Sequence, residues 1–538
     1  MGEEPRLSGI FDAPTAAEVK RALRARASDR LGALDDPQLY GLLSEAVYLE
    51  RRRLSSGDTA AEGEAEAVEA LARALHQGRI DQERAALALV EQYTGEVHNR
   101  FSPRTYNFAT SILPGTLTRL LTFTERPSQL VGGDFDPNSR IKVSGPIDAL
   151  RELSKTHTLI VAPTHLSNMD SPLIGYALYQ AGLPPVVYGA GLNLFENPLM
   201  AFFMSRLGAY TVDRRKKHSL YKDVLKDYST EVISRRCHSL FFPGGTRSRS
   251  GKLETKLKKG LLGTGLGAWQ EGLASGRENP EVLVVPCVLS CSLVLEAETL
   301  IEESLKEEGK QRYIISDDEF ADSRAVANFG RKVLNLDASV HVRFCPPLDV
   351  FGNPVDDAGR SLDQRGEVID RRGYVTDASG HVVRDEQRDH VYTTGLARAI
   401  ERAYRRDNTA LSTHVTAFAA WNLLRAGHPR LDVFQTALLG PSERNLRFSA
   451  LLAAMERAIA GLKRREAEGQ LRTALPSGGA RGALFEAVAR FGSFHNRRAV
   501  ELRGEDLAVI DPKLALYYSN RLVGYGLEAE VQHQGGTP

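Results

Sequence analysis

A histidine and an aspartate lie close together in the sequence, just after an apolar run. The run TLIVAP (158–163) leads into THLSNMD, which holds His165 and Asp170, and the helix-like segment SPLIGYALYQ follows. Five residues turn a helix by about 500°, so the two side chains meet only if His165 lies in the loop and Asp170 in the first helical turn. A carboxylate that holds one imidazole nitrogen leaves the other to take a proton from an alcohol. The spacing therefore predicts a general base, His165, oriented by Asp170; Ser167 to Asp170 also fits a capping box, and both interpretations stay open.

A second block combines glycine, threonine and arginine. It reads FPGGTRSRSGK from Phe242, and its turn of Gly244, Gly245 and Thr246 exposes backbone amides beside the guanidinium groups of Arg247 and Arg249. Amides in a turn together with arginine forks are typical of phosphate sites. We therefore predict that this turn binds a phosphate group.

The stretch before this turn is strongly basic in an almost neutral chain. Residues 206–259 contain 15 Lys and Arg against 5 Asp and Glu, and the block LGAYTVDRRKK holds Asp213 and Arg214. Its Lys216–Lys217 pair fits a solvated surface as well as it fits a phosphate site.

Two other polyanion sites fit the sequence less well. A Walker A loop needs Gly-x4-Gly-Lys-Ser/Thr, whereas five residues separate Gly245 from Gly251 and Leu253 follows Lys252. A nucleic-acid site would explain the basic charge, but no aromatic residues are interleaved with it and no known module is recognisable. We expect no nucleic-acid partner.

Alternating strands and helices position these residues. Apolar, β-branched runs occur at 158–163, 185–190, 239–245, 282–289 and 340–347, with helical stretches between them. Such alternation predicts an α/β fold with a mixed, largely buried sheet and helices on its faces, flanked by helical N- and C-terminal regions. Open α/β sheets bind ligands at the carboxyl ends of their strands, where His165 would lie.

Four regions follow from these patterns. We predict a helical N-terminal region (1–125), an α/β domain (126–350), an inserted β segment (351–392), and a helical C-terminal region with a polar tail (393–538). In the insert Asp-x-x-Gly recurs every seven residues, as Asp356/Gly359, Asp363/Gly366, Asp370/Gly373 and Asp377/Gly380. This pattern fits type I turns between short strands and lacks the spacing of an EF-hand, so a structural or docking role is favoured.

The bulk composition is that of a globular protein of about two or three domains. The 538 residues carry a formal net charge of +1, and four cysteines are too few for a disulfide framework. No secretory signal is evident, and no stretch reaches the roughly 18 apolar residues of a membrane span. Residues 105–124 and 194–210 fit either membrane-surface contact or core packing. We expect a cytoplasmic protein, peripheral on the cytoplasmic face of the membrane, that needs no metal.

Four blocks in this order resemble the glycerolipid acyltransferases. The blocks are His165-x4-Asp170, Gly208 to Arg214, the FPGGTRSR turn, and Val285-Pro286 in the last core strand, and they cover roughly residues 140–350. The segments between them look more like glycerol-3-phosphate acyltransferases, a group that includes dihydroxyacetone-phosphate acyltransferases. The resemblance implies that His165 is the base, that Arg214, Arg247 and Arg249 hold the acceptor phosphate, and that Val285 and Pro286 line the thioester side.

The activity implied is transfer of a fatty acyl group from acyl-CoA or acyl carrier protein to the sn-1 hydroxyl of glycerol 3-phosphate, with no cofactor. Many relatives carry Phe-Pro-Glu-Gly-Thr-Arg in the third block, whereas this chain has Gly244 where the acid stands. The missing carboxylate leaves open a changed acceptor or a weaker activity. A lysophosphatidate acyltransferase and a non-catalytic lipid-binding scaffold are the alternatives.

Overall fold

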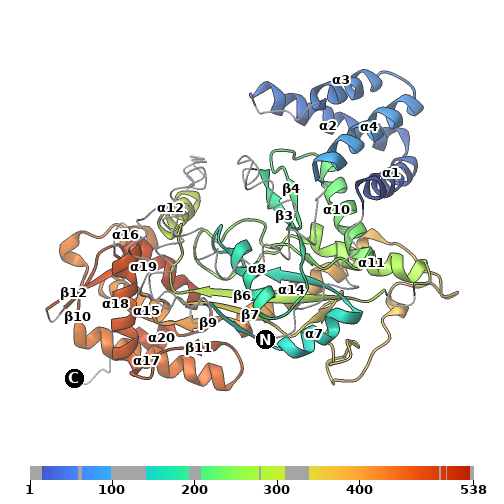
Figure 1. Ribbon diagram of the computed structural model, residues 1–538. Helices are drawn as coiled ribbons and strands as arrows, with labels where there is room; N and C mark the ends of the chain where they lie inside the picture. Colours follow the sequence, from blue (N-terminus) through green and yellow to red (C-terminus); the bar gives the residue numbers. More distant parts are fainter. Residues whose placement is uncertain are drawn as a thin grey trace, which may run out of the picture.

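A mixed sheet of eight strands forms the centre of the molecule (Figure 1). The computed structural model describes residues 15–57, 63–97, 141–192, 207–277, 280–308, 339–495, 498–504 and 506–532. In chain order the strands of the sheet are β1 (Ile141–Ser144), β2 (Thr158–Pro163), β3 (Val187–Gly191), β4 (Ala209–Val212), β5 (Ser239–Leu240), β6 (Val282–Cys291), β7 (Val340–Phe344) and β8 (Leu348–Asp349). The predicted α/β class is confirmed, and β1 and β4 are strands that the sequence patterns did not predict.

The strands on either side of β2 run in one direction. The spatial order is β1-β7-β6-β2-β5-β3-β4, with β8 beside β6. Strands β6, β2, β5, β3 and β4 are parallel, and β7 runs antiparallel to β6. The carboxyl ends of β2, β4, β5 and β6 therefore lie at one edge of the sheet, and each of the four sequence blocks is on or directly after one of these strands.

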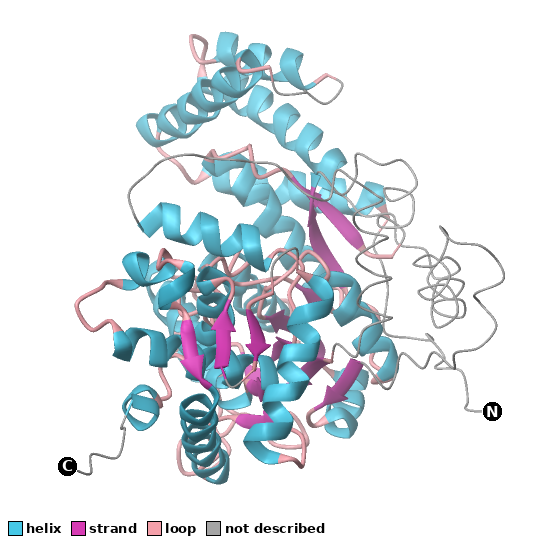
Figure 2. Cartoon of the chain, turned by 90° about the vertical axis from the view of Figure 1, so that its left-hand side faces the viewer, coloured by secondary structure: helices cyan, strands magenta, loops and turns pink. Residues whose placement is uncertain are grey.

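Helices cover both faces of the sheet (Figure 2). The alternation along β2 sends Leu159 and Val161 into one core cluster and Ile160 and Ala162 into another. The first cluster includes α7 (Ile147–Thr156) and α8 (Asp170–Gln180), and the second includes α11 (Lys259–Ala274) and α14 (Glu386–Asp407). Both faces are thus apolar, as expected for a mainly parallel sheet.

The N-terminal helices pack on the edge of the sheet that carries β3 and β4 (Figure 1). They are α1 (Ala16–Gly32), α2 (Asp36–Ser55), α3 (Glu64–Ala74) and α4 (Arg79–Val97), and they share a core with α10 (Ser219–Ser234). Arg26 pairs with Glu231, and Arg30 with Asp227, across this contact. Ion pairs as well as apolar packing therefore join these helices to the sheet.

The Asp-x-x-Gly segment forms the predicted turns at three of its four repeats. The amides of Gly359, Gly366 and Gly380 donate to the carbonyls of Asp356, Asp363 and Asp377. The strands between them are reduced to isolated bridges, such as Val355 with Ser361. The fourth repeat differs, because a short 3-10 helix (Arg372–Tyr374) replaces its turn.

The C-terminal region is not purely helical, which corrects the prediction. Strands β10 (Asn445–Arg447), β12 (Val500–Arg503) and β13 (Asp506–Val509) form a small antiparallel sheet, and β9 (Thr409–Leu411) pairs with β11 (Arg472–Ala474). These strands are too short for a periodic pattern to reveal them. The remaining helices are α12 (Ala297–Glu308), which precedes β7, and α15 (Ser412–Gly427), α16 (Val433–Ala437), α17 (Phe448–Ala467), α18 (Gly479–Phe494), α19 (Pro512–Ser519) and α20 (Glu528–Gln532).

Cysteine burial and the two candidate membrane segments complete the comparison with the sequence. All four cysteines are free and buried, as predicted, and burial raises the pKa of the Cys287 and Cys291 thiols. None of the helices that the structure describes has both the length and the apolar character to cross a membrane. Residues 105–124 and most of 194–210 lie outside the described residues.

Candidate active site

His165 and Asp170 meet at the carboxyl end of β2. His165 lies in the loop that follows the strand, and Asp170 is the first residue of α8, the only geometry in which the two can pair. The imidazole Nδ1 lies 2.9 Å from Asp170 Oδ2, and the carboxylate is fully buried. With Nδ1 protonated and donating to the carboxylate, Nε2 carries the lone pair. The arrangement fits a general base.

Asp170 also organises the loop. Its Oδ2 accepts the amides of Leu166 and Ser167 at 2.5 and 2.9 Å, in addition to the imidazole. The Ser167 bond is one half of the capping box that the sequence suggested, so the orienting and capping roles coexist. One carboxylate oxygen therefore fixes both the ring and the backbone around it.

The amides of this loop are all used inside the protein. Those of His165 and Asn168 donate to Glu254 and Glu296, that of Met169 to Ser167 Oγ, and that of Asp170 to the Ser167 carbonyl. They are not available to an oxyanion in this conformation. In the 244–246 turn, by contrast, the Gly244 and Thr246 amides have no acceptor among the described residues. This turn is the better candidate for an oxyanion hole.

The third block lies directly against the histidine. The Phe242 ring stacks on the His165 imidazole with centroids 4.2 Å apart, and the Ser248 amide donates to the His165 carbonyl at 2.8 Å. The turn and the base, about 80 residues apart in sequence, thus form one site because β5 pairs with β2.

Glu296 connects the base loop to Arg247. This buried acid follows β6, and it accepts the Ser167 hydroxyl at 2.8 Å, the Asn168 amide at 3.0 Å and Arg247 Nη1 at 3.1 Å. Arg247 is 27% exposed on its side chain, so the rest of its guanidinium can still reach a ligand. The sequence gave one usable signal for Glu296: an acid shortly after a core strand that ends at the site edge.

The other cations of the basic stretch are placed differently. Arg249 pairs with Glu303 and Glu307 on α12, so its charge is already balanced. Lys216 is buried between Glu64 and Glu96 of the N-terminal helices, which corrects the expectation of a solvated or phosphate-binding residue. Arg214 follows the edge strand β4, three strand spacings from β2, or roughly 14 Å. Arg247 is the predicted arginine that the structure places at the base.

Val285 and Pro286 lie in the interior of the sheet. Both belong to β6 and pair with Val161 and Ala162 of β2, and Val285 is 1% exposed. We had expected them to line the thioester side. Because a parallel neighbour covers them in the middle of the sheet, they support the loops of the site from below instead.

A further acid, Glu254, reaches the site from the segment after the third block. Its Oε1 accepts the His165 amide at 2.8 Å, while its Oε2 is buried and has no hydrogen-bond partner among the described residues. Burial raises the pKa of this carboxyl to about 8, the His165 amide and Arg521 counteract that rise, and Asp170 adds to it. The carboxyl group is therefore mostly neutral at neutral pH.

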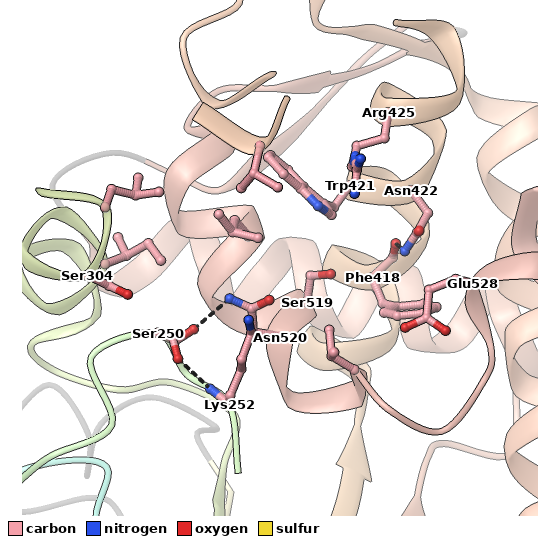
Figure 3. A pocket seen from close by; sticks show the side chains of 15 residues that line it. Ser250, Lys252, Ser304, Phe418, Trp421, Asn422, Arg425, Ser519, Asn520 and Glu528 are labelled. Carbon is pink, nitrogen blue, oxygen red and sulfur yellow. Dashed lines mark hydrogen bonds between the residues drawn. The ribbon is translucent and has the colours of Figure 1, made fainter. Parts of the chain in front are cut away.

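The C-terminal region anchors the end of the third block. The Asn520 side-chain amide donates to the Ser250 carbonyl at 2.8 Å, and the Ser250 hydroxyl accepts the Lys252 amide, beside a pocket of about 240 Å³ (Figure 3). Gly251 has φ +78°, and a Cβ there would lie 2.2 Å from the Tyr517 carbonyl oxygen. The close approach of the two backbones requires glycine.

We expect Gly251→Ala to lower the free energy of unfolding by about 1–3 kcal/mol beyond the cost of a left-handed alanine, because the loop must move away from α19. Gly276→Ala is the matched control, since Gly276 has φ +65° and nothing within 4 Å of the added Cβ. Chemical denaturation of both variants separates the two terms. Equal losses in the two variants would show that the contact with Tyr517 has no energetic weight.

The fold and the site are those of an acyltransferase domain. Residues 140–290 match the family model described as Acyltransferase. A glycerol-3-phosphate acyltransferase from Haemophilus ducreyi is 35% identical over 158 residues, which cover 29% of this chain and 19% of that protein. One from Pseudoalteromonas translucida is 30% identical over 197 residues, or 36% of this chain and 23% of that protein. This chain therefore contains a domain of the glycerolipid acyltransferase family, on the side of the glycerol-3-phosphate acyltransferases.

The similarity covers only part of these proteins. The chain spans about a fifth of the length of the relatives that it matches. A crystal structure of the 1-acyl-sn-glycerophosphate (LPA) acyltransferase PlsC from Thermotoga maritima is also similar, with 14% identity, a TM-score of 0.26, and coverage of 67% of this chain and 93% of that one. At that TM-score the likeness has no bearing on the acceptor.

Proposed function

We propose that this chain transfers a fatty acyl group from a thioester, on coenzyme A or acyl carrier protein, to the sn-1 hydroxyl of glycerol 3-phosphate. The observation that carries this proposal is the hydrogen bond from His165 Nδ1 to the buried Asp170, beside a turn with two amides that have no acceptor among the described residues. The glycerol-3-phosphate acyltransferases that match residues in this domain support the choice of acceptor.

The proposed reaction is direct transfer without a covalent enzyme intermediate. His165 Nε2 takes the proton of the acceptor hydroxyl as its oxygen attacks the thioester carbonyl carbon. The amides of Gly244 and Thr246 stabilise the tetrahedral oxyanion. The carbon–sulfur bond then breaks, and the proton on Nε2 passes to the thiolate. The products are lysophosphatidate and the free thiol, and the residues named here supply each step without a cofactor.

A matrix of acceptors and donors tests this function. Purified protein is given glycerol 3-phosphate, dihydroxyacetone phosphate or lysophosphatidate, each with acyl-CoA and with acyl carrier protein. We expect the highest kcat/KM with glycerol 3-phosphate. A preference for lysophosphatidate would favour that alternative acceptor, and thioester binding without turnover on any acceptor would favour a lipid-binding scaffold.

Arg247 is the guanidinium that we assign to the acceptor phosphate. We expect Arg247→Ala to raise the KM for glycerol 3-phosphate by about ten- to a hundredfold, the weight of a hydrogen bond between charged groups. Arg249→Ala is the matched control and should change KM by about twofold or less, because Glu303 and Glu307 already pair with Arg249. Steady-state kinetics with varied acceptor measure both, and the opposite ranking would move the phosphate site to Arg249.

A further inference from the structure

The position of Glu254 explains why the third block can carry glycine where many relatives carry an acid. A Cβ built on Gly244 would lie 2.8 Å from Glu254 Oε1 and 3.0 Å from its carboxyl carbon. The backbone of Gly244 is not in the left-handed region, so conformation alone does not demand glycine there. What excludes a side chain at residue 244 is the carboxyl group of Glu254.

That carboxyl group is held at the base. Glu254 Oε1 accepts the amide of His165, the residue whose ring pairs with Asp170 and stacks on Phe242. The His165 carbonyl in turn accepts the Ser248 amide. The two backbone groups of His165 are thus fixed by the segment 242–254, one through an acidic side chain and one through the main chain.

We propose that Glu254 is a positioning residue for His165, and that Gly244 leaves the space in which its carboxyl group lies. The acid absent from residue 244 is in this way supplied from ten residues further along the chain. This assignment rests on the proposed function, since His165 is taken as the base. It concerns the placement of the base and not the chemistry of any further proton transfer.

The hydrogen bond that Glu254 accepts needs an oxygen at Oε1 and not a charge. An uncharged glutamine keeps that oxygen, whereas alanine removes it and opens a cavity. Alanine at residue 244 leaves Glu254 intact but pushes its carboxyl group away from the His165 amide. The three changes therefore separate loss of the group, loss of its acidity and loss of its position.

Four variants test the proposal: Glu254→Ala, Glu254→Gln, Gly244→Ala and the double variant Gly244→Ala/Glu254→Ala. We expect Glu254→Ala and Gly244→Ala each to lower kcat by about ten- to a hundredfold, the scale of a small misplacement of a catalytic group, with the KM for the thioester unchanged. Glu254→Gln should stay within about threefold of wild type. In the double variant the Gly244→Ala change should cost nothing further, because the group it displaces is gone. Gly260→Ala is the glycine control, since the nearest atom to its added Cβ is 3.9 Å away.

Amide hydrogen exchange gives a second result that needs no turnover. The His165 amide should exchange faster in Glu254→Ala and Gly244→Ala and should remain protected in Glu254→Gln. Wild-type exchange in Glu254→Ala, or losses in kcat that add in full in the double variant, would overturn the proposal. A wild-type protein that acylates no acceptor would instead contradict the proposed function, while the exchange data would still decide the role of Glu254.

Discussion

His165→Ala is expected to lower kcat for acyl transfer to glycerol 3-phosphate by about 10²–10⁴-fold, the usual contribution of a positioned general base. The ring makes its one printed side-chain hydrogen bond to Asp170 and stacks on Phe242, so its removal takes away the base and leaves the rest of the turn in place. The KM for glycerol 3-phosphate should change little, because Arg247 and the turn amides are untouched. Steady-state kinetics with varied acceptor measure both constants.

His381→Ala is the histidine control for this variant. His381 lies in the last Asp-x-x-Gly turn, with its side chain 82% exposed, and its replacement should leave kcat unchanged. The thermal midpoint of each variant is measured in the same samples to show that the chain is folded. A His165→Ala protein with wild-type kcat would remove His165 from the mechanism.

Lys216→Met should destabilise the protein by about 3–5 kcal/mol, the cost of breaking a buried ion pair from one side. The Lys216 ammonium group is 1% exposed and lies 2.6 Å from Glu64 and against Glu96, with the Tyr93 ring 4.5 Å away. Methionine fills most of the space but leaves two carboxylates without their cation. Because these acids belong to α3 and α4, the variant should loosen the N-terminal helices from the block that precedes α10.

The same variant should have a characteristic pH dependence. Burial already raises the pKa of Glu96, and Lys216 opposes that rise, so its loss moves the folded-state pKa further above the unfolded value of about 4.3. A folded state that binds more protons than the unfolded state loses stability as pH rises through that window. The deficit relative to wild type should therefore be smaller near about pH 5 than near about pH 8.

Chemical denaturation at the two pH values measures this effect. Lys217→Met is the matched control: its side chain is exposed, and the change in unfolding free energy should stay within about 0.5 kcal/mol. Equal stability of the Lys216 and Lys217 variants would show that the buried ion pairs do not hold the N-terminal helices.

Local patterns in the sequence predicted the central elements of the fold well. The apolar run 158–163 coincides with β2, and β6 extends the run 282–289 by two residues. The run 239–245 yields only the two-residue strand β5, because its Phe-Pro-Gly-Gly part leaves the sheet to form the turn of the site. The C-terminal strands of three or four residues carry no periodic signal, and so a helical region was predicted there.

Spacing along the chain predicted the pair His165 and Asp170, because the two residues are joined by one short loop. It did not predict Glu254 and Glu296, whose contacts with that loop join residues 89 and 128 positions apart. Lys216 was misjudged for the same reason, since its partners Glu64 and Glu96 belong to the N-terminal helices. A charged residue in a basic run reveals its role only when the fold shows which acids lie opposite.

The central claim is that glycerol 3-phosphate is acylated by this chain. The most direct measurement incubates the purified wild-type protein with radiolabelled glycerol 3-phosphate and a long-chain acyl thioester, on coenzyme A and on acyl carrier protein in parallel, and follows the label into the organic phase. We predict thioester-dependent formation of labelled lysophosphatidate with at least one donor. Label that stays in the aqueous phase with both donors would contradict the account.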